Sequence, residues 1–565
     1  MKILIEGYRY RANDVSAILK GLGYTFTDNY VTVKHVGYFF NKEIGDTVFF
    51  LPKVLVNEND EVLGRKDLRP EKILDLATAL GNNLLSRDDY SFIYEFSVWI
   101  YRTVKEYSRL HPGSDIIYTT SYSLIDKSQN NVDATWLDII LSLIKFNDRN
   151  RDFFMFVIKN IHSGYNKINW PRTIAKSKAV ISNKRPVYID PVNKKKQINF
   201  DEELLVIFFS CLSYINSNYG FETTINYNYD LVTGSRFEHY LNGFGRARLR
   251  QIKYKYFSDK AIELWNLCYS FFESAEKIRS SQQGGDCMLA RKFEIVFEAI
   301  IDELIGDKTA KIPSELIEQQ DGKIVDHLFL GQSLVCDSDI YYIGDSKYYK
   351  IGSSLSGNPV YKQYTYAKNV IQANIDRLFK GKEHIRYRDD ITEGYDITPN
   401  FFISAEVRDS LTYSDTSLKL RDKDWKVMFH FHDRLFDRDT LWLSHYDVNF
   451  LSVIALYARA DEYEKSTFRE QAHKQFRTHI IDLLNTRYDF CLLRPKSGYT
   501  LAEAVDANFR KLIGKIFSPD GHIAVLAAER GTAPALEAEI GRYFEIDKGY
   551  RLGDKLPDSA EELGS

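Results

Sequence analysis

The sequence has few cysteines, and none of them falls in a metal-binding pattern. Its 565 residues include only five, and these are Cys211, Cys268, Cys287, Cys336 and Cys491. An odd number of widely spaced cysteines without a CxxC pair argues against both a disulfide framework and a zinc site. We therefore expect reduced thiols in a protein core.

Long apolar segments are also missing. No run of eighteen apolar residues occurs, and the first residues, MKILIEGYRYRAND, lack the apolar core of a signal peptide. Such segments are needed for a membrane-spanning helix or for export. The sequence therefore predicts a cytoplasmic protein with no membrane partner.

The chain carries no excess of positive charge and no nucleotide-binding loop. Its 75 basic and 78 acidic residues give a net charge of −3. Overall charge therefore excludes DNA binding by gross electrostatic attraction, and any such binding must come from local patches. The pattern GxxxxGK[ST] is absent, so we do not expect this chain to hydrolyse ATP or GTP alone.

The length indicates several domains. We predict an α+β region at 1–130, a mixed strand and helix region at 131–285, a catalytic domain at 286–460, and a C-terminal region at 461–565 with no assigned chemistry. The alternation of strand-like and helix-like segments predicts α/β layers within an α+β chain.

The residues that carry chemistry lie in the segment 323–350, KIVDHLFLGQSLVCDSDIYYIGDSKYYK. Two strands are predicted here, at 324–330 and 340–349, joined by a short turn. The first carries Asp326, and the second ends with Asp345, Ser346 and Lys347. Side chains alternate along a strand, so Asp345 and Lys347 should share one face.

Phosphodiester hydrolysis explains why these residue types belong together. A hard divalent cation neutralises the charge that develops on the phosphate and acidifies water, and Mg²⁺ prefers oxygen ligands. The carboxylates of Asp326 and Asp345 and the backbone carbonyl of Ser346 can supply three oxygens. The Lys347 ammonium could orient the attacking water or stabilise the transition state. A chance pattern of solvated strand-end residues is the alternative.

Flanking segments complete a predicted helix, strand, strand, helix, strand order. A helix is expected at 287–306, where Glu298 could join the metal ligands or could be an ordinary solvated acid. A second helix at 360–379 carries Lys362, Gln363 and Tyr366 near its start, where Gln363 is a candidate DNA contact. An apolar strand follows at 400–405. This order predicts a compact α/β/α core with a mixed sheet.

One basic and aromatic segment, 244–257, is a candidate DNA-binding surface. Cations in such a segment can contact phosphates while the aromatic side chains stack or pack. A solvated helix face is the alternative. The candidate residues are Arg246, Arg248, Arg250, Lys253 and Lys255.

The D…DxK arrangement resembles the PD-(D/E)xK nuclease superfamily, although Val325 stands where the superfamily's name has proline. Within it, residues 90–460 resemble the LlaJI-type restriction endonucleases, which are relatives of the McrC subunit. Three further segments carry this resemblance, together with Trp442: 168–174 (INWPRTI), 434–437 (RLFD) and 446–450 (YDVNF).

The resemblance implies a restriction-endonuclease-like fold that cuts duplex DNA with Mg²⁺, or with Mn²⁺ as the alternative ion. It also implies a partner, a McrB-like AAA+ GTPase ring engaged by residues 1–285, and an oligomeric assembly formed through that ring. Two other functions stay open. The chain could be a catalytically silent DNA-binding activator that caps the ring, or it could be a DNA-repair or RNA nuclease.

Overall fold

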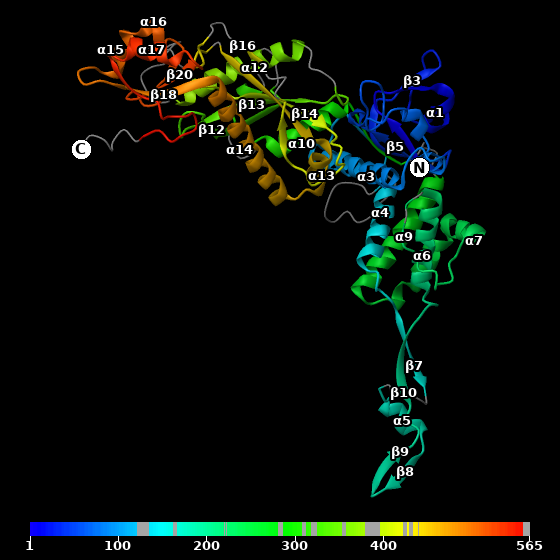
Figure 1. Cartoon of the computed structure of the whole chain (residues 1–565). Coiled ribbons are helices and arrows are strands. Elements are labelled where there is room, and N and C mark those ends of the chain that lie inside the picture. Colours follow the sequence, from blue (N-terminus) through cyan, green and yellow to red (C-terminus); the bar gives the residue numbers. More distant parts are fainter. Residues whose placement is uncertain are drawn as a thin grey trace.

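Figure 1 shows the computed structural model, in which the chain forms a wide body with a narrow arm projecting from it. The structure describes residues 1–120, 135–161, 167–219, 221, 223–280, 286–307, 312–317, 325–352, 357–378, 396–421, 426–428, 433–438 and 440–557. The five cysteines are free, as predicted, and four of them are buried. Within the described ranges, none of the helices combines the length and apolar character needed to cross a bilayer.

The N-terminal unit is built on a sheet with the strand order β1-β5-β4-β11-β6. The strand bounds are Lys2–Ile5 (β1), Asp46–Leu51 (β5), His35–Asn41 (β4), Cys287–Arg291 (β11) and Ile117–Thr120 (β6). The long helix α3, Arg87–Leu110, packs on this sheet through β4 and β11. Its first turn is fixed by a capping box between Ser86 and Asp89.

The strand β11 corrects one sequence prediction. Residues 287–291 were expected to begin a helix, but they pair with β4 and β6 in the N-terminal sheet. A run of Cys, Met, Leu and Ala is compatible with a helix or with a strand. Here the segment forms a strand because it is buried between β4 and β6. The helix α10 starts only at Phe293 and ends at Ile305, after Lys292 adopts a left-handed φ of 55°. The N-terminal sheet and the catalytic core therefore share a continuous segment.

A helical region and an arm lie between β6 and β11 in the sequence. The helices α4 (Trp136–Arg149), α6 (Glu203–Tyr219) and α9 (Asp259–Ser280) pack against one another. The arm begins with an antiparallel ribbon of β7, Phe156–Ile161, and β10, Asn193–Ile198. Its distal part contains α5 (Trp170–Lys176) and the hairpin of β8 (Ala179–Ser182) and β9 (Arg185–Tyr188).

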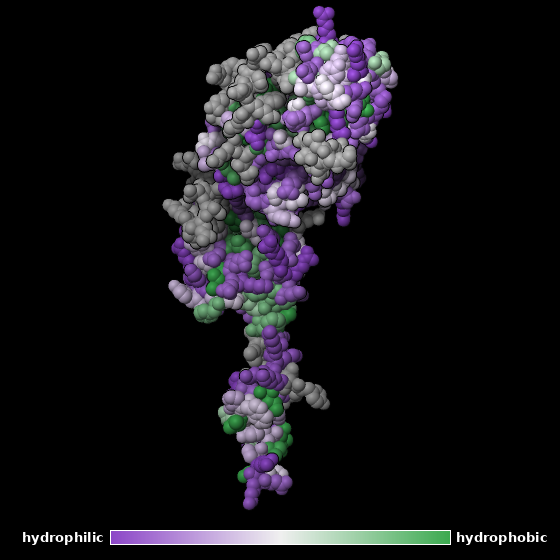
Figure 2. Space-filling model, turned by 90° about the vertical axis from the view of Figure 1, so that its left-hand side faces the viewer, coloured by the Kyte–Doolittle hydropathy of each residue, from purple (hydrophilic) through white to green (hydrophobic). Residues whose placement is uncertain are grey.

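The arm exposes apolar side chains that a two-stranded ribbon has no interior to bury. The exposed fractions are 62% for Ile174, 79% for Ile181 and 76% for Ile189. Exposed cations such as Lys184 and Arg185 lie beside them. Figure 2 shows these apolar and polar patches along the narrow projection. A patch of this kind is typical of a surface that contacts another macromolecule.

The predicted catalytic core has a sheet with the strand order β12-β13-β14-β17-β15. The strand bounds are His327–Gln332, Asp339–Lys347, Asn400–Glu406, Leu441–Asn449 and Leu418–Leu420. The strand β13 pairs antiparallel with β12 and parallel with β14, and β14 pairs parallel with β17. The predicted strands and their mixed pairing are confirmed, with bounds that differ by a few residues.

Helices cover both faces of this sheet (Figure 1). On one face, Tyr341 and Ile343 pack with Tyr366 and Val370 of α12, Gly357–Leu378. On the other face, alternate residues of β13 join the large cluster that includes α10 and α13, Phe450–Arg459. The predicted helix, sheet, helix layering is therefore confirmed, and the chain has the predicted α+β fold.

The C-terminal region forms its own small unit. The helix α14, Glu462–Arg487, runs from the core to a sheet with the strand order β19-β20-β18-β21. Its strands are Ile516–Phe517 (β19), Ala524–Glu529 (β20), Tyr488–Pro495 (β18) and Phe544–Asp547 (β21). This unit has separate apolar clusters on its two faces.

Asp286, the residue before β11, links the N-terminal sheet to helix α4 and offers a test of that contact. It is fully buried and accepts a hydrogen bond of 2.8 Å from the Trp136 backbone N–H. Burial raises the pKa of Asp286 to about 8, from 3.8. The stabilising contribution of this carboxyl is therefore complete below about pH 4 and is lost as the pH rises to about 8.

We expect Asp286→Asn to stabilise the protein, and to do so by about 3 kcal/mol more at pH 8 than at pH 5. The amide oxygen keeps the bond from Trp136 but cannot ionise. Thermal unfolding followed by tryptophan fluorescence at both pH values measures this difference. An equal effect of the substitution at pH 5 and pH 8 would contradict it.

Candidate active site

The register of β12 and β13 brings Asp326 and Asp345 together. His327 pairs directly with Gly344 in the antiparallel ladder, and Asp326 comes one residue before His327 while Asp345 comes one after Gly344. The two aspartates therefore face one another across the strands, with their side chains on the same face. Asp345 is 7% exposed and Asp326 is half-buried.

The two carboxyl groups interact strongly. Burial raises the pKa of Asp326 far above its usual range, and the neighbouring Asp345 carboxylate raises it further. Two carboxylates this close in a partly buried site cannot both ionise without a counter-charge. The Ser346 backbone N–H donates a hydrogen bond of 3.3 Å to Oδ2 of Asp326. A cation or a shared proton is needed between the two acids.

Glu298 lies near this pair but on another element. It sits on α10, whose residues Phe293, Phe297 and Ile301 are buried against the core. Glu298 itself is half-buried. Burial raises its pKa, and the negative charge of Asp345 raises it further, while the His327 and Lys347 charges act in the opposite direction. The structure therefore brings Glu298 within electrostatic range of the predicted site.

Lys347 points to the same side as Asp345. Its ammonium forms an ion pair with the Asp345 carboxylate, and its Nζ lies 5.1 Å from the centre of the Phe402 ring. Its side chain is 14% exposed. Residues two apart on a strand share a face, which is why the DxK spacing places the amine beside the acid. The predicted grouping of Asp326, Asp345 and Lys347 is thus present.

Ser346 faces the opposite side of β13. Its hydroxyl is 2.5 Å from Nε2 of His327, and both residues are buried. Only its backbone carbonyl is a candidate ligand on the carboxylate side. His327, whose Nδ1 lies 3.5 Å from Asp302, was missed in the sequence. A single histidine within an apolar strand does not indicate, from the sequence alone, that its ring contacts Ser346.

The donor set fits a hard divalent cation. Mg²⁺ keeps several waters and is usually bound through only one or two carboxylates, which Asp326 and Asp345 supply. In the part of the chain that the structure describes, no three His, Cys, Asp or Glu side chains are grouped closely enough to hold a metal ion together. Asp326, Asp345 and Glu298 therefore do not form such a group here, and the predicted role of Glu298 as a metal ligand stays a prediction.

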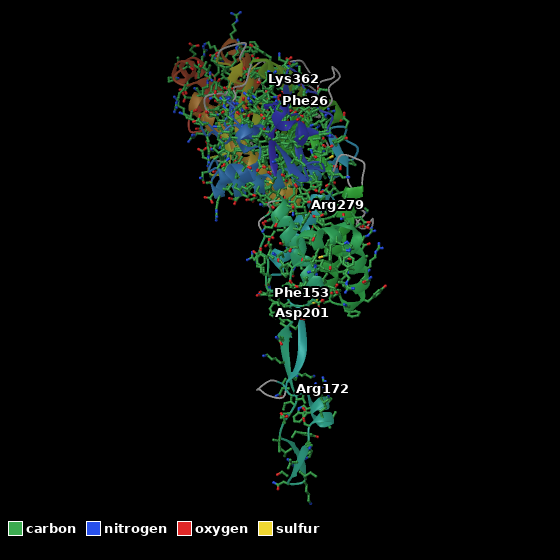
Figure 3. All side chains as sticks on the ribbon, turned by 90° about the vertical axis from the view of Figure 1, so that its right-hand side faces the viewer. Phe26, Phe153, Arg172, Asp201, Arg279 and Lys362 are labelled. Atoms are coloured by element: carbon green, nitrogen blue, oxygen red, sulfur yellow. The ribbon has the colours of Figure 1, made fainter. Side chains whose placement is uncertain are left out.

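Two of the polar residues named near the start of α12 differ in exposure. Gln363 is fully buried, and its Nε2 donates a 2.7 Å hydrogen bond to Oδ1 of Asn400. It ties α12 to β14 and has no exposed surface for DNA. Lys362 is exposed, its Nζ lies 5.3 Å from the centre of the Tyr366 ring, and Figure 3 labels it on the main body. The Tyr366 hydroxyl raises the pKa of Lys362, and the Asp345 and Asp326 charges raise it further.

The basic segment 244–257 makes contacts within the helical region. Arg246 pairs with Glu276 at 3.1 Å, and Arg248 makes two hydrogen bonds to Glu203. Arg250 donates to the Tyr269 hydroxyl at 2.6 Å. The Lys253 Nζ lies 4.8 Å from the centre of the Trp265 ring, and Lys255 lies 3.7 Å from Glu203. These contacts explain the segment as a helix surface held to α6 and α9, while DNA contact by it stays a prediction.

The N-terminal unit contacts the end of the strand that carries the DxK residues. The Tyr348 hydroxyl donates a 2.5 Å hydrogen bond to Glu6 and accepts a 3.2 Å bond from the Lys53 backbone N–H. Lys350 forms an ion pair of 2.5 Å with Asp60. The catalytic strand is thus fixed at its end by residues from the first sixty of the chain.

Two comparisons with known proteins bear on this arrangement. Residues 88–387 match a protein family described as LlaJI restriction endonuclease. That interval is 300 residues of 565, which is more than half of the chain. It contains α10, β12, β13 and α12, and hence the paired aspartates and Lys347. A comparison with curated proteins finds no match.

We expect Asp326→Asn to raise the thermal unfolding midpoint in metal-free buffer, because it removes the repulsion between two buried carboxyls. The same substitution should abolish the increase in midpoint that added MgCl₂ gives the unaltered protein. Asp339→Asn is the control, since Asp339 is an exposed acid at the other end of β13. A magnesium-induced shift that survives in Asp326→Asn would contradict the predicted site.

Proposed function

Because this chain belongs to the LlaJI restriction endonuclease family, we propose that it is the Mg²⁺-dependent nuclease subunit of a restriction system and that it cuts duplex DNA. The observation that carries this proposal is the opposed pair of Asp326 and Asp345 beside the Lys347 amine. Phosphodiester hydrolysis needs this combination of oxygen ligands and a fixed positive charge.

Each residue of the site then has a distinct task. Asp326 and Asp345 bind the divalent ion, which would neutralise the charge that builds up on the scissile phosphate. Lys347, which forms an ion pair with Asp345, orients the attacking water or the phosphate oxygens. Glu298, half-buried on α10, is the remaining predicted acid of the site and lies within electrostatic range of Asp345. Lys362, exposed on α12, supplies a cation for an approaching DNA backbone.

A partner follows from the same proposal. The sequence resemblance implies a McrB-like AAA+ GTPase ring, engaged by residues 1–285, and an assembly that forms through that ring. The arm supports this assignment, because it projects away from the core and exposes both apolar and basic side chains. The contacts of Glu6 and Lys53 with Tyr348 offer a route by which ring engagement reaches the catalytic strand.

The principal test is DNA cleavage by the purified chain with the proposed McrB-like GTPase partner, GTP and MgCl₂. We expect Asp345→Ala or Lys347→Ala to reduce cleavage of duplex DNA by at least about 100-fold, because the first removes a proposed ligand of the ion and the second removes the fixed positive charge. GTPase stimulation should be unchanged. Asp339→Ala, on the same strand but away from the site, should cut normally.

Full cleavage by both variants would refute the site assignment. Stimulation of the GTPase by the unaltered chain, without magnesium-dependent cutting, would instead identify a catalytically silent activator. Parallel reactions with circular duplex, linear duplex and RNA separate an endonuclease from a repair or RNA nuclease.

Removal of the distal arm tests the partner assignment separately. Replacing residues 168–192 with a short Gly-Ser turn leaves the ribbon of β7 and β10 to close normally, because Lys194 N–H already bonds to the Lys167 carbonyl at 2.8 Å. We expect this variant to lose GTPase stimulation but to keep its magnesium-induced thermal stabilisation. Normal stimulation of the ring would contradict a role for the distal arm.

A further inference from the structure

The N-terminal unit contains a basic pocket far from the paired aspartates in sequence. It has a volume of about 250 Å³ and lies between the short ribbon of β2 (Arg9–Arg11) and β3 (Tyr30–Thr32) and the ends of β4 and β11. The loop that leads into β3 carries Phe26, which Figure 3 labels on the main body. Three cations line the pocket, Arg9, Lys34 and Arg291, and none of the described residues adds a carboxylate to the lining.

Among the described residues, these three cations have no acidic partners. In the part of the chain described by the structure, none of their charged groups lies within ion-pair distance of a carboxylate, whereas Arg65 and Arg109 of the same unit are paired with Asp89 and Glu106. All three residues are exposed. The Arg9 guanidinium lies 4.6 Å from the centre of the Tyr30 ring, which limits its motion. Uncompensated positive charge around one concavity is the electrostatic signature of an anion site.

Hydrogen bonds between its lining residues hold the wall of the pocket in place. The Tyr24 hydroxyl is hydrogen-bonded to Nδ1 of His35 and accepts a bond of 3.2 Å from the Lys34 backbone N–H. His35 is 6% exposed, and burial together with the Arg291 charge lowers its pKa to about 4. The imidazole is therefore neutral at pH 7. Thr25, Thr27 and Thr32 add hydroxyl groups to the same lining.

We propose that this pocket binds a phosphate group, carried either by a free nucleotide or by a DNA strand. Three converging cations with hydroxyl donors match the charge and the several acceptor oxygens of a phosphate better than a single carboxylate. The volume of about 250 Å³ admits a phosphate with its attached sugar. This assignment does not depend on the catalytic residues.

The position of Arg291 connects the pocket to the catalytic core. Arg291 pairs with His35 at the end of β11, and Lys292 follows with a left-handed φ of 55°. Phe293 then begins α10, which carries Glu298. A phosphate bound to Arg291 would therefore restrain the backbone next to Lys292, the residue that precedes α10. Occupancy of the pocket is placed to adjust the position of Glu298 relative to Asp345.

Binding to the full chain in EDTA, where no divalent ion links DNA to the aspartates, tests this proposal. The probes are inorganic phosphate, GMP and a fluorescein-labelled ten-nucleotide DNA strand, measured by calorimetry for the first two and by fluorescence anisotropy for the third. We expect Arg9→Gln and Arg291→Gln each to weaken binding of the recognised probe by about tenfold. Binding should also weaken with added NaCl.

Arg11→Gln is the matched control, because Arg11 is an exposed cation on the same strand as Arg9 but does not line the pocket. Thermal unfolding checks that each variant is folded. Binding of GMP that displaces the DNA strand assigns the pocket to a free nucleotide, whereas binding of the strand alone assigns it to DNA. Both results support the proposal. It is overturned if no probe binds, or if Arg9→Gln and Arg291→Gln bind as tightly as Arg11→Gln.

Discussion

The repulsion between two carboxyl groups is the constraint around which this protein is organised. Asp326 and Asp345 face one another because His327 pairs with Gly344 in the antiparallel ladder, which places the residues on either side of that pair opposite each other. Burial and mutual repulsion raise the pKa of Asp326, so the pair is costly unless a positive charge shares the site. The fold supplies one such charge as Lys347, and under the proposed function a divalent ion would supply the remainder. Relief of this repulsion would then favour binding of the ion.

Much of the surrounding structure holds these groups in place. On one face of the sheet, α12 packs on Tyr341 and Ile343 and is tied to β14 by the buried amide of Gln363. On the other face, α10 carries Glu298 and is positioned by β11 of the N-terminal sheet. The site is thus assembled from two sheets, and the N-terminal unit is part of its support rather than a separate attachment.

The sequence predicted the parts of the site that depend on short-range periodicity. The spacing of Asp345 and Lys347 and the strand pair around Asp326 follow from alternation along a strand, and both are present. It did not predict β11, because a short apolar segment is equally compatible with a helix until its neighbours are known. Gln363 was misjudged for a related reason: whether a polar helix residue faces solvent or a buried amide depends on tertiary packing. The position of His327 beside Ser346 likewise follows only from the pairing of β12 with β13.

The strands β6 and β11 are neighbours in the N-terminal sheet, yet β6 ends at Thr120 and β11 begins at Cys287. The helical region and the arm, which lie between them in the sequence, are outside the sheet, and the chain returns to the adjacent strand position. Such an excursion is topologically an insertion in a hairpin connection. Its length and tip can diverge among homologues, or be exchanged between them, without disturbing the register on either side. A protein built this way can acquire a new docking specificity while its hydrolytic centre stays unchanged.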